Sequence, residues 1–142
     1  MKSHTLAITI ALGAIIAPAK PMIYIALLAI FLDTAFGIWK SVKLKGWKSI
    51  KSRRLSVSIS KSLLYSGAIL FAFFIEKYIA ADLLQLIVGV DLLLTKVLTL
   101  FCIITEVKSI NESYEDVTGI NIWTKFKKMV VRAKDEVGEI KD

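Results

Sequence analysis

The sequence predicts an all-α integral membrane protein with three or four transmembrane or membrane-embedded helices and a cytoplasmic amphipathic helix at the C-terminus. Hydrophobic residues make up 56% of the 142-residue chain, yet the net charge is +7, so apolar and charged residues must be separated along the sequence. The apolar segments are also apolar on nearly every side, whereas a helix of a soluble domain keeps one polar face. A membrane domain over residues 1–110 and a tail over residues 111–142 are therefore expected.

The membrane domain is predicted from four apolar blocks. A helix rises about 1.5 Å per residue, so roughly 20 residues are needed to cross the hydrocarbon core of a bilayer. Only the second and the fourth block approach that length. The blocks cover residues 6–17, 22–39, 63–75 and 83–104.

The first block is short for a complete span, and we expect it to be tilted into the membrane or packed at its surface. Pro18 and Pro21 follow it, and two prolines do not fit one straight helix. They predict a tight turn or a kink before the second block. The basic start, the apolar core and the sequence Ala17-Pro18-Ala19 also fit a secretory signal peptide, which is the alternative for this segment.

The charge pattern predicts the orientation. Residues 40–61 carry eight Lys and Arg side chains and no acidic residue, so the positive-inside rule places this basic loop in the cytoplasm. The connections at residues 17–21 and 76–82 hold few charges and fit the opposite side, and the C-terminal tail returns to the cytoplasm. Trp47 is the aromatic residue among the charges, which argues against nucleic acid as a partner. Anionic membrane lipids are the expected contact.

Asp33 is a carboxylate inside the second block, where a charge is costly unless it has a partner or water. Ala26, Ala29 and Gly37 share its helix face at spacings of three and four residues. Small residues allow another helix to approach closely. Asp33 is therefore predicted to face a neighbouring helix or a polar lumen, with Ala26 and Ala29 as helix-packing positions.

The last apolar block supplies a candidate partner for Asp33. One face of this segment is polar from end to end, and Lys96 lies beside that face at a depth from which it could reach Asp33. In one interpretation this is a packed bundle with an Asp33–Lys96 pair. In the other, the polar face lines water once several copies assemble. The polar face consists of Asp91, Thr95, Thr99, Cys102, Glu106 and Ser109.

Catalysis finds little support in the sequence. His4 is the only histidine and Cys102 the only cysteine, and no metal-ligand cluster, glycine-rich phosphate loop or nucleophilic set can be assembled. Asp33 and Asp91 could form an intramembrane protease pair, but no motif residues surround them. We predict a protein that is not an enzyme and needs no cofactor.

The tail has an apolar seam at spacings of three and four residues, which predicts an amphipathic helix. Basic residues come first and acidic residues later. Such a helix could lie on the membrane or pair with other subunits. The seam consists of Trp123, Phe126, Val130, Ala133, Val137 and Ile140.

Several of these features together resemble the toxin-secretion and phage-lysis holins, over roughly residues 5–128. The features are Asp33 followed by Gly37, the basic loop, and a helix that contains Glu106, Ser109-Ile110 and Glu112 before Gly119. The resemblance implies a multi-pass protein of the bacterial inner membrane, encoded by a phage or prophage. Such a protein forms homo-oligomers and opens lesions that release an endolysin or a toxin. The alternative is a small membrane channel, a transporter subunit or a membrane anchor for a partner protein.

Overall fold

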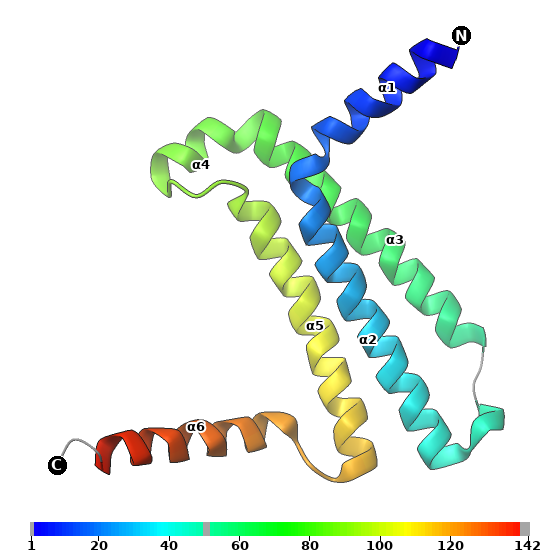
Figure 1. Cartoon of the computed structure of the whole chain (residues 1–142), viewed down its shortest axis with the longest axis vertical. Helices are drawn as coiled ribbons and strands as arrows, with labels where there is room; N and C mark the ends of the chain where they lie inside the picture. The colour runs from blue at the N-terminus through cyan, green and yellow to red at the C-terminus, as the bar shows by residue number, and fades with distance from the viewer. Residues whose placement is uncertain (1, 50–51, 140–142) are drawn as a thin grey trace.

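The computed structural model describes residues 2–49 and 52–139, and this part of the chain contains helices and turns without a strand. The helix α2 (Lys20–Lys45), the helix α3 (Ser52–Ile75) and the helix α5 (Leu93–Thr118) form a three-helix bundle (Figure 1). α2 and α5 run in the same direction and α3 runs against them. The all-helical prediction is confirmed.

Two stretches of the described chain are long and apolar enough to cross a membrane. They are Ala17–Lys45, with 29 residues, and Ser52–Ile87, with 36 residues. α5 has 26 residues, or roughly 39 Å at about 1.5 Å per residue, but it carries charges on its inner face and near its end. Where the three helices meet, the core is formed by apolar side chains that include Ile30, Ile69 and Phe73.

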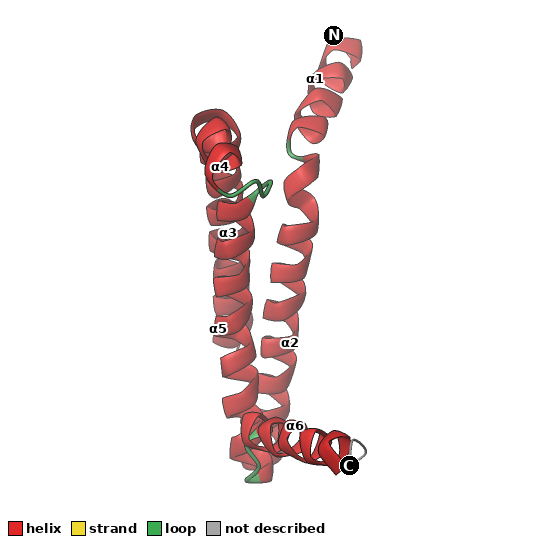
Figure 2. Ribbon diagram, turned by 90° about the vertical axis from the view of Figure 1, so that its left-hand side faces the viewer, coloured by secondary structure: helices red, strands yellow, loops and turns green. Residues whose placement is uncertain are grey.

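The first apolar block lies in helix α1 (Lys2–Ile15), which a 3₁₀ turn at Ala17–Ala19 joins to α2. Pro18 lies in that turn and Pro21 in the first turn of α2, where a missing backbone N–H costs no hydrogen bond. Figures 1 and 2 show that α1 leaves the axis of α2 without folding back along it. Of the two predicted possibilities, the structure has the kink.

The basic segment 40–61 is not one loop, contrary to the prediction. α2 continues to Lys45, a 3₁₀ turn covers Trp47–Ser49, and α3 already begins at Ser52. Lys, Arg, Ser and Leu are all tolerated in helices, so the charges alone did not mark the helix ends. The break comes at Gly46, which ends α2 with a φ of 80° that favours glycine. The block 63–75 is accordingly the second half of α3.

The block 83–104 is not one span either. α3 continues through a π-helical turn at Glu76–Ala80 into α4 (Ala81–Ile87), and α5 starts only at Leu93. The chain reverses between these helices, where Leu92 takes the left-handed conformation with a φ of 55°. A bulky residue rarely adopts that conformation, so hydropathy could not reveal the turn.

The tail forms helix α6 (Ile122–Glu139), which projects sideways from the end of the bundle (Figures 1 and 2). α5 runs without a break past residue 110, so the expected domain boundary falls inside this helix. The Asn111 side chain accepts a hydrogen bond of 2.9 Å from the backbone N–H of Ile122 and so ties the start of α6 to α5. Of the predicted seam, Ile140 and the side chains of Ala133 and Val137 lie outside the described part.

Candidate functional site

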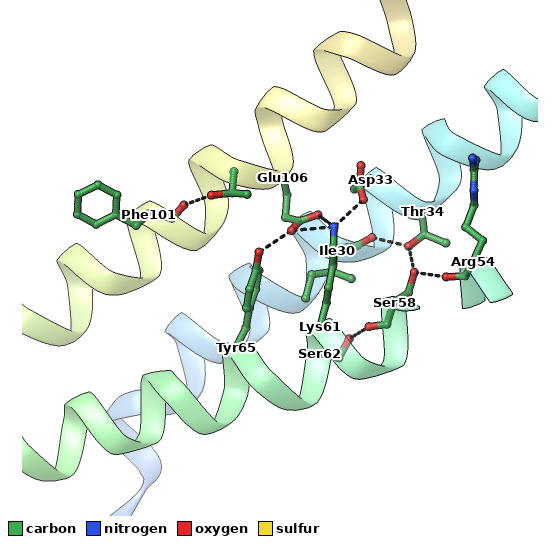
Figure 3. Close-up of polar contacts among 11 residues, drawn as sticks. Ile30, Asp33, Thr34, Arg54, Ser58, Lys61, Ser62, Tyr65, Phe101 and Glu106 are labelled. Atoms are coloured by element: carbon green, nitrogen blue, oxygen red, sulfur yellow. Dashed lines mark hydrogen bonds and ion pairs between the residues drawn. The ribbon is translucent and has the colours of Figure 1, made fainter. Parts of the chain in front are cut away.

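A charged cluster joins the three long helices near the middle of the bundle (Figure 3). The Lys61 ammonium of α3 lies 3.2 Å from Oδ2 of Asp33 on α2 and 3.0 Å from Oε2 of Glu106 on α5. Tyr65 donates a hydrogen bond of 2.8 Å to Oε1 of Glu106. The Glu106 side chain is fully buried and that of Asp33 is 15% exposed. One lysine thus holds carboxylates from two other helices.

The cluster depends on a polar face of α3. Ser58, Lys61 and Tyr65 follow one another at spacings of three and four residues, which places them on one side of the helix. Nearer the helix start, the hydroxyl groups of Ser58 and Thr34 share a hydrogen bond of 2.6 Å. The polar face of α3 therefore faces both α2 and α5.

Asp33 pairs with Lys61 and not with Lys96, so the predicted pair is wrong. Because α2 and α5 run in the same direction, Glu106 lies level with Asp33. Lys96 comes ten residues before Glu106, or roughly 15 Å farther along the helix, and it is exposed. A lysine stem does not cover that distance.

The polar face of α5 points into the bundle over most of its length. Thr95, Thr99, Cys102 and Glu106 are buried, and the Thr99 hydroxyl donates to the Thr95 carbonyl at 2.7 Å. Asp91 differs, because it lies in the turn before α5 and is exposed. Within the described part of the chain, every buried side-chain nitrogen and oxygen atom has a hydrogen-bond partner.

Glu76 is a second buried carboxylate, with 3% of its surface exposed. It accepts hydrogen bonds of 3.0 Å each from the backbone N–H groups of Leu94 and Thr95, and one of 2.7 Å from the Thr95 hydroxyl. The residue that precedes α5 is Leu92, whose side chain has no acceptor for these N–H groups. Glu76 therefore caps α5 from another helix, where its charge also suits the helix dipole.

The helix-packing positions expected on α2 are buried inside the single chain. Ala26 is 1% exposed and Ala29 is 8% exposed. Gly37 is buried next to Arg54 of α3, and a Cβ atom at Gly37 would lie 2.7 Å from Nη1 of Arg54. These small residues accommodate α3 and α5 of the same chain.

A polar cavity of about 290 Å³ extends from the cluster toward the end of the bundle where α6 begins. Its lining contains three basic residues, Lys40, Arg54 and Lys61, so it can hold water beside the buried charges. Lys40 also forms an ion pair with Asp116. The acidic lining residues are Asp33, Glu112 and Asp116, and the hydroxyl residues are Thr34, Ser58, Ser109 and Ser113.

Sequence reasoning missed Lys61, Tyr65 and Glu76 as parts of the site. Lys61 was counted among the loop charges, although its spacing from Ser58 and Tyr65 is helical and could have revealed the polar face of α3. Glu76 offered no such signal, because its role depends on a chain reversal that hydropathy does not show.

The fold and the site define a helical membrane protein whose polar groups are turned inward between three helices. Residues 10–135 match the family model of the bacteriophage holin family, so the chain belongs to this family. The predicted resemblance is thereby confirmed. The family and the two apolar stretches both indicate that the chain is a protein of the inner membrane. Comparison with curated proteins and with solved structures gives no match.

Proposed function

We propose that this holin accumulates in the host inner membrane, assembles with copies of itself and opens lesions through which an endolysin or a secreted toxin passes. The supporting observation is the cluster of Lys61, Asp33 and Glu106. Its ion pairs hold the three helices together with their polar side chains inside, while large apolar side chains cover the outside of the bundle. A single chain with this apolar outer surface is compatible with the surrounding lipid. To line water, the polar face of α5 must separate from α2 and α3, and its groups must then find water or other copies as partners.

The proposed topology is multi-pass. The end of α2 and the start of α3, which carry most of the basic residues of segment 40–61, lie at the same end of the bundle as the start of α6. The turn at Ala17–Ala19 and the turn at Glu76–Ala80 lie at the opposite end. The positive-inside rule then places the end with α6 in the cytoplasm. The membrane domain 1–110 and the cytoplasmic tail 111–142 remain the proposed division of roles.

Each predicted site residue receives a role in this proposal. Four residues face the interior of the single chain and line the water-filled lesion after assembly: Asp33, Thr95, Thr99 and Glu106. Ala26, Ala29 and Gly37 form the face on which helices approach closely, first within one chain and then between copies. Asp91 and Lys96 are exposed outside the bundle and are available to neighbouring copies.

A cleavable crosslink tests whether the bundle must open. Lys40 and Asp116 already form an ion pair between α2 and α5, so Lys40→Cys with Asp116→Cys in a Cys102→Ser background provides two thiols for a cleavable bis-maleimide. Vesicles that contain the uncrosslinked protein should release an enclosed enzyme. Crosslinking should stop that release, and cleavage should restore it.

The control crosslink joins Lys108→Cys to Glu112→Cys, because these two residues lie one turn apart on α5 and a link between them does not join α5 to another helix. It should leave the release unchanged. Release that continues with α2 fixed to α5 would show that the bundle need not open.

The alternative of a small channel is favoured by the polar cavity of about 290 Å³ inside the single chain. The same vesicles separate the two functions. A channel would pass ions while the enclosed enzyme stays inside, and its ion flux would continue with the crosslink in place.

A further inference from the structure

Helix α6 carries an uncovered apolar face. Trp123 is 51% exposed and Phe126 is 58% exposed, so at least half of each side chain is left uncovered. At 100° per residue, the apolar residues of this face fall within an arc about 120° wide. They are Ile122, Trp123, Phe126, Met129 and Val130.

The same stretch is strongly basic. Residues 122–132 contain Lys125, Lys127, Lys128 and Arg132 and no acidic residue, which gives a charge of +4. Lys125 and Lys127 each lie about 40° beyond one border of the apolar arc. Long basic side chains at such borders can place their charges among anionic groups while their stems cover apolar surface.

The position of α6 adds a separate argument. α6 projects sideways from the bundle at the end where α2 ends and α3 begins (Figures 1 and 2). Its start is held there by the hydrogen bond between Asn111 and Ile122 and by one of 2.7 Å from Asn121 to Glu115. A bundle that spans the bilayer would therefore carry α6 near the plane of the cytoplasmic headgroups.

We propose that α6 lies in the headgroup layer of the cytoplasmic leaflet, with its apolar arc toward the acyl chains and its basic borders on anionic phospholipid headgroups. Amphipathic helices with Trp and Phe on one face and Lys and Arg around it bind such surfaces. A parallel pair with a second copy of α6 fits less well, because it would bring two stretches of charge +4 together. The proposal does not depend on lesion formation.

Trp123 provides the probe for the test. Trp39→Phe and Trp47→Phe leave Trp123 as the only tryptophan of the full-length chain. The protein is reconstituted in vesicles of phosphatidylcholine alone or with phosphatidylglycerol. In the anionic vesicles, Trp123 emission should shift to the blue, lose its quenching by acrylamide and gain quenching by brominated lipids, and added salt should reduce these effects.

Two results would overturn the proposal. In the first, Trp123 stays exposed to acrylamide in both vesicles. In the second, Trp123 is protected equally in both and the protection follows the ratio of protein to lipid, which is the behaviour of α6 paired with another copy.

Two matched variants place the contact on one face of α6. Phe126→Asp puts a charge into the apolar arc and should abolish the blue shift of Trp123. Val131→Asp introduces the same charge on the opposite side of the helix, where Val131 is 57% exposed, and should retain most of the shift. Equal losses in the two variants would contradict an oriented helix.

Discussion

Cys102 allows the strength of the charged cluster to be measured without adding a label. It is the only cysteine of the chain, it is 8% exposed, and it lies on the inner face of α5 one turn from Glu106. A thiol reagent therefore reaches it when α5 separates from its neighbours. The rate of labelling reports the open fraction as long as closing is faster than labelling. We predict that Lys61→Met raises this rate.

The magnitude follows from what Lys61→Met leaves behind. Glu106 is fully buried and would keep only the hydrogen bond from Tyr65, and loss of one partner from a buried ion pair costs about 3 kcal/mol or more. Lys61 itself is 32% exposed and borders the polar cavity, so water compensates part of the loss. We expect a destabilisation of about 2–3 kcal/mol, which corresponds to roughly 30- to 150-fold faster labelling.

A second lysine provides the control. Lys108 lies on α5 with its side chain 76% exposed and 3.9 Å from Glu112, so Lys108→Met should change the rate by less than about threefold. Adding Glu106→Gln to Lys61→Met should recover part of the loss, because a neutral amide can still accept the Tyr65 hydrogen bond. Equal rates for Lys61→Met and Lys108→Met would refute the role of the cluster in closing the bundle.

Three further predictions concern other contacts of α5. Glu76→Gln removes the charge that caps α5, so the helix start should lose about 1 kcal/mol and hydrogen exchange at the N–H groups of Leu94 and Thr95 should accelerate roughly fivefold. Asn111→Ala frees the N–H of Ile122, and hydrogen exchange there should accelerate while exchange in the core of α5 stays unchanged. In a background without other cysteines, Ser109→Cys in the polar cavity should react with a small cytoplasmic thiol reagent, whereas Thr99→Cys in the dry interior should not.

The sequence was sufficient for those parts of the fold that depend on local periodicity. The polar face of α5 was predicted because Thr95, Thr99 and Glu106 recur at helical spacing. A tight turn or a kink was predicted because two prolines interrupt an apolar segment, and the structure has the kink. The small residues around Asp33 also indicated a close helix neighbour. Each of these signals lies within one segment and needs no knowledge of the other helices.

The remaining features depend on how distant segments meet. Asp33 needed a cation, and Lys61 was overlooked because the helical part of the basic segment was not recognised. The cap by Glu76 depends on the chain reversal between α4 and α5, where Leu92 adopts a backbone conformation for which its side chain gives no signal.

The two ends of the bundle differ in how much free energy it costs to separate α5 from α2 and α3. At the end near α6, the polar cavity can admit water to the cluster, and separation there exposes ion pairs that water can solvate. At the other end, Ile69 and Phe73 are buried and Glu76 holds the start of α5 by three hydrogen bonds. Separation there would leave the Glu76 carboxylate and the backbone N–H groups of Leu94 and Thr95 without hydrogen-bond partners, which costs more. We therefore expect α5 to part first from α2 and α3 at the end near α6, with its start at Glu76 as the pivot.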